Sequence, residues 1–254
     1  MKQNMSHHHR RAQVLVSLLA VPLVFSSGVA LADDLSIVPA EPSITIPTLV
    51  TETVTTAGDS LLKIKATGAR LIADRTHALN KLKAKIQSSK LTIEQKSTLI
   101  AKIDDRVVKL NALAGTIKTG TDASSTKQEV NSIFTDYRIF AVFIPQINFD
   151  WDILALNNYT VKLPVVFAKI QSNIDTAKAK GQDVTARQAS LNKANSLLAD
   201  ANSKLDGLPA KVDALTPSDY PTNSQAVFQA TKTTIQAVQA DLKQIRSVKI
   251  KKAN

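Results

Sequence analysis

The chain has 254 residues, with 32 Lys and Arg against 21 Asp and Glu, a formal charge of +11, and no cysteine. The lack of cysteine excludes a disulfide framework, a thiol nucleophile and a lipid-attachment cysteine. The positive charge favours anionic partners, although a moderate charge also serves solubility.

The first 32 residues follow the order of a secretory signal peptide. A basic start precedes an apolar run over residues 12–25, and an Ala-Leu-Ala tripeptide ends at Ala32, before an acidic pair. The run is shorter than the roughly 20 residues of a membrane-spanning helix, so we predict cleavage after Ala32, with a retained anchor as the alternative. Cleavage removes three basic and no acidic residues, which lowers the formal charge from +11 to +8. The sequence thus predicts a secreted or cell-surface protein.

Residues 33–59 are rich in threonine and proline and have no helical period. Prolines at 39, 42 and 47 and the β-branched residues around them favour an extended tether. A short edge strand over residues 43–50 is the alternative.

Long amphipathic helices are predicted next, over residues 60–87 and 92–119. Apolar residues in the second alternate spacings of three and four, which is typical of a packed helix. Thr92 and Gln95 have the spacing of a capping box, and Gly120 stands where a left-handed residue ends many helices. The connection between the two helices is so short that they are expected to be antiparallel neighbours.

The pattern recurs toward the C-terminus. Residues 184–205 form an apolar stripe with many alanines between Gly181 and Gly207, and a last helix follows a second capping-box spacing at Thr222 and Gln225. The predicted fold is therefore all-α, an elongated, coiled-coil-like bundle of long antiparallel amphipathic helices over residues 60–254.

Eight of the eleven aromatic residues fall between residues 134 and 167. The spacing predicts a helix over residues 125–144, with a strand over residues 138–144 as the alternative. Beyond Pro145, Asp150 is expected to cap a short helix, and Pro164 to restart the helix before residue 165. We expect the aromatic segment to be the most buried part of the protein, on which the long helices converge.

The run Asp136-Tyr137-Arg138-Ile139-Phe140, with the proline after it and the alanine- and lysine-rich helices around residues 181–185, resembles a group of uncharacterised exported bacterial proteins. Members of that group are helical and rich in coiled coil. The resemblance covers roughly residues 60–250, and it implies neither an activity nor any functional residue.

No constellation of catalytic, cofactor-binding or metal-binding residues stands out, so no cofactor is expected. His77 is the one histidine after the predicted cleavage site and has no second histidine or cysteine to share a metal. The pair Asp150 and Asp152 is read as helix capping in preference to acid/base chemistry. The residues expected to form an interaction surface are the aromatic and basic side chains of Phe140, Phe143, Trp151, Tyr159, Lys249, Lys251 and Lys252.

These observations favour an exported structural or interaction protein that presents long helices at or outside the cell surface, and not an enzyme. One alternative is a lipid-active or pore-forming type of helical protein that uses the aromatic segment 138–168. Another is a binder of anionic polymer. The expected partner is a protein or an anionic envelope polymer; nucleic acid is not expected, and membrane contact and oligomer formation remain open.

Overall fold

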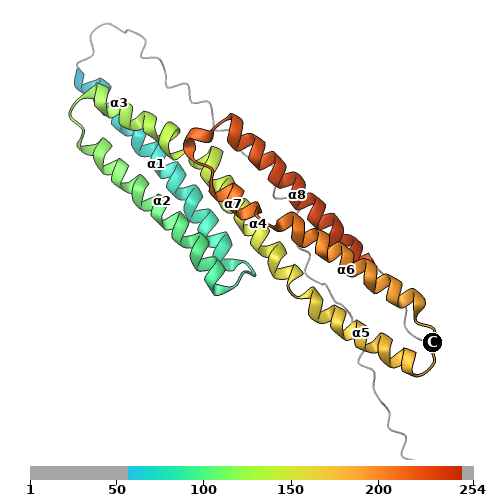
Figure 1. Cartoon of the computed structure of the whole chain (residues 1–254). Coiled ribbons are helices and arrows are strands. Elements are labelled where there is room, and N and C mark those ends of the chain that lie inside the picture. Colours follow the sequence, from blue (N-terminus) through green and yellow to red (C-terminus); the bar gives the residue numbers. More distant parts are fainter. Residues whose placement is uncertain (1–56, 248–254) are drawn as a thin grey trace, which may run out of the picture. The chain divides into compact units, whose positions relative to one another are not determined.

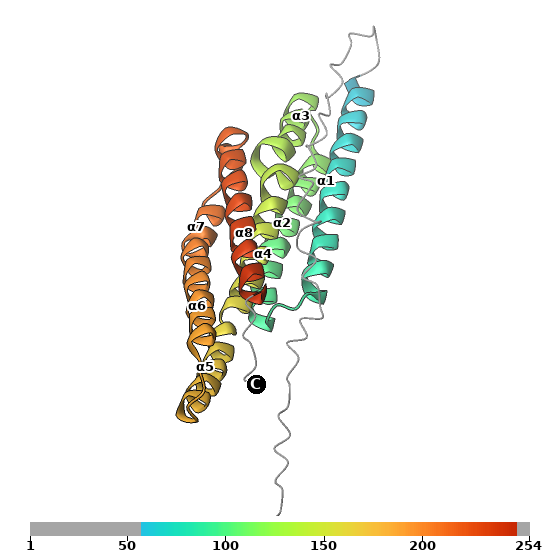
Figure 2. The same ribbon diagram turned by 90° about the vertical axis from the view of Figure 1, so that its right-hand side faces the viewer.

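The computed structural model describes residues 57–247, of which 88% are helical, and no strand occurs among them. The all-α prediction is confirmed, and the strand alternative for residues 138–144 is wrong. The predicted signal peptide, most of the predicted tether with its alternative strand, and the basic residues Lys249, Lys251 and Lys252 lie outside the described residues. Figures 1 and 2 show the helices from two sides.

Helices α1 (Ala57–Ser88) and α2 (Ile93–Thr119) pack side by side, and α2 folds back along α1 after a short connection (Figures 1 and 2). The predicted capping box is present, since Thr92 accepts from the Gln95 backbone N–H and the Gln95 side chain accepts from the Thr92 N–H. Lys83 on α1 pairs with Asp104 on α2 at 2.7 Å.

Two glycines mark close approaches in this region. Gly120 has φ −53° and ψ 137°, so the predicted left-handed end of α2 is wrong. A Cβ on Gly120 would instead meet the hydroxyl of Thr126, and a Cβ on Gly68 of α1 would stand 2.8 Å from a methyl group of Val130. Both positions need glycine because of space, and neither has the positive φ that only glycine adopts freely.

Helix α3 (Ala123–Ser132) leads into two π-helical stretches, η1 (Ile133–Tyr137) and η2 (Ile139–Phe143). Helix α4 (Ile144–Thr160) follows directly, with Pro145 in its first turn. Pro145 therefore begins a helix where the sequence predicted an end, because a proline in the first turn has no hydrogen bond to lose.

Helix α5 (Leu163–Ala179) starts with Pro164 in its first turn, as predicted, and α6 (Thr185–Leu205) returns along it (Figure 1). Gly181 and Gly207 have φ of 75° and 68°, so the two glycines that flank the predicted stripe both turn the chain in the left-handed region. Gln171 on α5 and Gln188 on α6 exchange two side-chain hydrogen bonds of 3.0 Å.

Three further elements complete the described chain: α7 (Leu208–Asp213), the 3-10 turn η3 (Pro217–Asp219) and α8 (Thr222–Ser247). Neither α7 nor η3 was predicted. A capping box joins Thr216 and Asp219 at η3, earlier than the predicted one, and α8 begins at Thr222 itself.

Two groups of buried side chains hold these helices. The first lies between α1, α2, α3, the π-helical stretches and the start of α4. The second lies between α4, α6 and α8, where the rings of Phe149 and Phe228 stack with centroids 5.4 Å apart and Lys204 pairs with Asp241 at 2.7 Å. The predicted alanine-rich stripe is buried in this second group, through Leu191, Ala194, Leu198, Ala201 and Leu205.

By length and composition alone, one helical stretch of the described chain, Ala123–Ala179, could cross a membrane. In its most apolar window 61% of the residues are buried inside the protein, as they are in the core helix of a soluble protein.

Candidate functional site

Arg138 separates the two π-helical stretches and has φ 37° and ψ 48°, a left-handed conformation. For a residue with a Cβ this conformation costs about 1 to 2 kcal/mol, and π-helical turns are frequent at functional sites. The guanidinium of Arg138 lies over the ring of Tyr220, 4.5 Å from its centroid. Arg138 thus interrupts the helix in the middle of the Asp136–Phe140 run on which the predicted resemblance depends. Its side chain contacts Tyr220, in the segment before α8.

Arg75 of α1 lies under the same segment and is only 2% exposed. Its Nη1 donates to the carbonyl of Leu71 at 3.1 Å. Its guanidinium lies 4.8 Å from the ring centroid of Phe134 and 5.2 Å from that of Phe140, so two aromatic faces cover the charge. A cation enclosed in this way holds α1 against both π-helical stretches.

Helix α2 makes the third contact of this kind. The guanidinium of Arg106 lies 4.7 Å from the ring centroid of Phe143, and the hydroxyl of Tyr137 donates to the carbonyl of Lys109 at 3.2 Å. We call the whole set the arginine–aromatic cluster; its members are Arg75, Arg106, Arg138, Phe134, Phe140, Phe143 and Tyr220.

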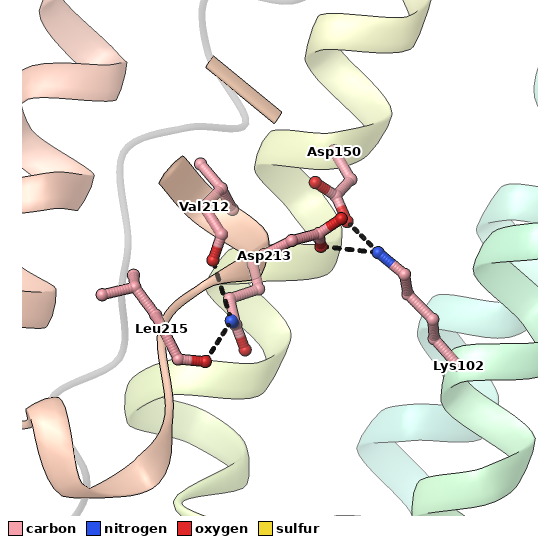
Figure 3. A network of polar contacts seen from close by, with 6 residues as sticks. Lys102, Asp150, Val212, Asp213 and Leu215 are labelled. Carbon is pink, nitrogen blue, oxygen red and sulfur yellow. Dashed lines mark hydrogen bonds and ion pairs between the residues drawn. The ribbon is translucent and has the colours of Figure 1, made fainter. Parts of the chain in front are cut away.

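A second polar assembly joins α2, α4 and α7 and is shown in Figure 3. Lys102 Nζ lies 2.9 Å from Asp150 Oδ2 and 2.6 Å from Asp213 Oδ1. We call these three residues the Lys102 junction. Beside it, the side-chain amide of Gln146 donates to the carbonyls of Val212 at 2.9 Å and Leu215 at 2.8 Å, which satisfies backbone groups at the end of α7.

Burial raises the pKa of Asp150 to about 6, against the opposing effect of its hydrogen bond and charge interaction with Lys102. Burial also disfavours the charge of Lys102, but its hydrogen bonds to Asp213 and Asp150 and their charges raise its pKa. Both pKa values are raised, which keeps Lys102 charged but favours the neutral form of Asp150. The two residues therefore do not form a simple ion pair in which each charge stabilises the other. The half-exposed Asp213 is therefore the carboxylate on which the charge of Lys102 mainly depends.

A depression of about 600 Å³ lies on the surface where the end of α4 meets the end of α6. Its lining consists mostly of neutral amides, hydroxyls and apolar groups, from Asn157, Thr160, Val161, Asn202, Ser203, Leu205, Asp206, Gly207 and Pro209. Within residues 57–247, no group of three or more histidine, cysteine or acidic side chains is placed to hold a metal ion.

The predicted interaction residues do not form one exposed surface within the described chain. Phe143 is buried against Arg106, and Phe140 is half-buried against Arg75. Trp151 is half-buried against the first core group, and Tyr159 is half-buried, with a pKa that burial raises. These side chains serve helix packing, although the half-buried ones keep an exposed edge.

Asp150 and Asp152 do not cap a helix. Both are buried in the middle of α4, and Asp150 faces Lys102 across the Lys102 junction (Figure 3). Sequence reasoning also missed Arg75, for which a signal existed. It stands on the apolar face of the predicted first helix, three residues after Ile72 and four before Leu79, where an arginine needs a partner in the core.

Comparison of the chain with protein-family models, with curated proteins and with solved structures gave no match. The resemblance to exported helical proteins therefore stays a prediction.

Proposed function

We propose that the protein is an exported structural or interaction protein, which binds a partner along the surface of its helices and has no catalytic role. One observation carries the proposal: the buried and half-buried charges connect helix to helix. Arg75 lies between α1 and the π-helical stretches, Lys102 links α2 to α4 and α7, and Lys204 links α6 to α8. Charged side chains that pair between helices fix the arrangement of those helices. A partner would therefore be bound by the outer faces of the helices.

The proposal includes the finer architecture expected from the sequence, an elongated bundle of antiparallel helices. At 1.5 Å per residue, a helix of the length of α1 spans about 48 Å. A spherical domain of this chain length would have a radius of gyration of about 18 Å. Small-angle scattering of the protein should give a clearly larger radius, and a value near 18 Å would contradict an elongated bundle.

Retention by envelope material tests the binding role. Immobilised protein lacking residues 1–32 should retain one or a few components from whole cells and their envelope fractions, at salt concentrations that release an unrelated basic protein of equal charge. Retention that disappears with salt in parallel with that control would indicate the anionic-polymer alternative. Retention of nothing from any fraction would contradict the proposal.

The lipid-active alternative is supported by the apolar stretch Ala123–Ala179. Its aromatic part would have to leave the core to enter a bilayer, which would expose Arg75 and break the Lys102 junction. Release of a dye from liposomes on addition of the protein would favour this alternative, and intact liposomes would favour the interaction role.

A further inference from the structure

The start of helix α5 has an apolar face that the described chain leaves uncovered. Val161 is 68% exposed and Val165 is 61% exposed, which is unusual for valines in a folded protein. Residues 161 and 162 keep helical backbone angles between α4 and α5, so positions 161 and 165 lie one turn apart on the same face. Pro164 and Ala168 are exposed beside them.

The opposite face of α5 is the one that packs. Leu163, Phe167 and Ile174 are buried, and α5 contacts α6 and the end of α4. The valines therefore have no role in the core of the described chain. The other large exposed apolar residues of this part are Leu62, Ile93 and Val108, which lie on α1 and α2 and form no such pair four residues apart.

Lys162 and Lys169 flank this face, and two more lysines lie at the far end of α5. Lys162, Lys169, Lys178 and Lys180 are exposed, and Asp175 is the one acidic residue between positions 161 and 180. None of the four lysines makes an ion pair among the described residues. The α5 face, which we define as Val161, Val165 and Ala168 with Lys162 and Lys169, thus combines apolar side chains with an excess of positive charge. The exposed Asp206, which lines the same surface depression as Val161, is the acidic side chain beside it.

We propose that the α5 face binds the surface of an anionic lipid bilayer, with the valines among the upper acyl chains and the lysines at the phosphate groups. A helix lies in a bilayer surface when apolar residues on one side meet lysines at the headgroup level. A second copy of the chain fits less well, because a symmetrical contact would bring the same lysines together. An anionic polymer would contact the lysines but would not bury the valines.

This inference specifies the partner of the proposed interaction protein and rests on that proposal. It differs from the pore-forming alternative, since binding through the α5 face requires no change in the core. The aromatic segment stays folded and the bilayer stays intact.

Sedimentation with vesicles tests the inference, on protein lacking residues 1–32 because the apolar run over residues 12–25 would itself bind lipid. The chain should sediment with vesicles of phosphatidylcholine and phosphatidylglycerol, more weakly with phosphatidylcholine alone, and without release of an enclosed dye. Val161→Ser with Val165→Ser should lower the partition coefficient about tenfold or more, because two apolar side chains no longer enter the bilayer. The matched control is Ile93→Ser with Val108→Ser, which alters two apolar residues on α2 that are at least about as exposed, and it should bind as the unaltered chain does.

Charge is tested in the same way. Lys162→Glu with Lys169→Glu should abolish the preference for anionic vesicles, whereas Lys63→Glu with Lys127→Glu, which changes the net charge by the same amount elsewhere, should largely keep it. Thermal unfolding followed by circular dichroism confirms that each variant is folded.

Two results would overturn the inference: no vesicle binding by the unaltered chain, or equal binding by the variant Val161→Ser with Val165→Ser and its control Ile93→Ser with Val108→Ser. Retention of an envelope protein without vesicle binding would refute the lipid surface and leave the interaction role standing.

Discussion

At the scale of single residues, the two mid-helix glycines Gly68 and Gly115 provide a matched pair. A Cβ on Gly68 would stand 2.8 Å from Val130 and 3.1 Å from Ile117, whereas a Cβ on Gly115 meets nothing within 4 Å. Both positions gain helix propensity from alanine, by about 0.5 to 1 kcal/mol. Only at Gly68 does the added methyl group force buried side chains on other helices to move.

We therefore expect opposite effects on the free energy of unfolding. Gly115→Ala should stabilise the protein by about 0.5 to 1 kcal/mol. Gly68→Ala should destabilise it by about 1 to 2 kcal/mol, because overpacking outweighs the gain in propensity. Chemical denaturation of the two variants measures both values. A stabilised Gly68→Ala variant would mean that α1 and α3 are not packed this closely.

Arg138 allows the cost of its backbone conformation to be separated from the contact with Tyr220. Both Arg138→Ala and Arg138→Gly remove the guanidinium, but only glycine is free of the cost at φ 37°. The glycine variant should be more stable than the alanine variant by about 1 kcal/mol. Equal unfolding free energies of the two variants would show that residue 138 is not left-handed in solution.

At the scale of elements, burial differs among the aromatic residues of the segment that the sequence predicted to be the most buried part of the protein. Phe140 and Trp151 are half-buried, whereas Phe149 is buried and stacks on Phe228. Phe149→Ala should therefore cost about 3 to 5 kcal/mol. Phe140→Ala should cost less, because Arg75 keeps its contacts with Phe134 and Leu71. A larger loss in the unfolding midpoint for Phe140→Ala than for Phe149→Ala would contradict this order.

The elements that could be predicted are those whose signals are local. The capping box at Thr92 and Gln95, the stripe between Gly181 and Gly207 and the restart at Pro164 all depend on neighbours in sequence, and the structure has all three. The π-helical stretches were missed because no residue type distinguishes a π turn from an α turn. Their aromatic side chains contact Arg75 and Arg106, which are distant in sequence.

The candidate site was largely beyond the sequence for the same reason. Lys102 and Asp150 are 48 positions apart, and Lys102 and Asp213 are 111 apart. An aspartate after an irregular segment favours a helix cap when only its neighbours are considered. Its role changes once α2 lies opposite, which is a property of the tertiary fold.

At the scale of the whole molecule, the Lys102 junction connects the two core groups, since α2 belongs to the first and α7 packs against the helices α4, α6 and α8 of the second. It also couples stability to pH through Asp150, whose pKa rises from its ordinary 3.8 to about 6 in the folded protein. A carboxyl group whose pKa is raised by folding binds its proton more tightly in the folded state. Its contribution to stability is therefore greatest below pH 4 and is lost as pH rises through about 6.

Asp150→Asn removes this titration, so the comparison with the unaltered chain isolates it from all other ionisable groups. Between pH 4 and pH 7 the unaltered chain should lose about 2.5 kcal/mol of unfolding free energy relative to Asp150→Asn, which is most of the effect of a pKa shift of about two units. Denaturant unfolding at a series of pH values measures the difference. A difference that stays constant over this range would show that Asp150 is ionised equally easily in both states.

Lys102→Met then tests whether the junction holds the two core groups together. Without the lysine, Asp150 is a buried charge with no cation, so at pH 7 the variant should lose about 3 to 5 kcal/mol. Much of the lost unfolding free energy should be recovered at pH 4, where the carboxyl group is neutral. It should also be recovered in the double variant with Asp150→Asn, where no charge remains to be paired. If the junction contributed only a surface ion pair, Lys102→Met would cost less than about 1 kcal/mol at every pH and Asp150→Asn would not rescue it. The pH dependence of this loss of unfolding free energy therefore distinguishes the two cases. A loss that shrinks at low pH means that Asp150 is a buried charge that needs Lys102, whereas a small loss at every pH means that the two form only a surface ion pair.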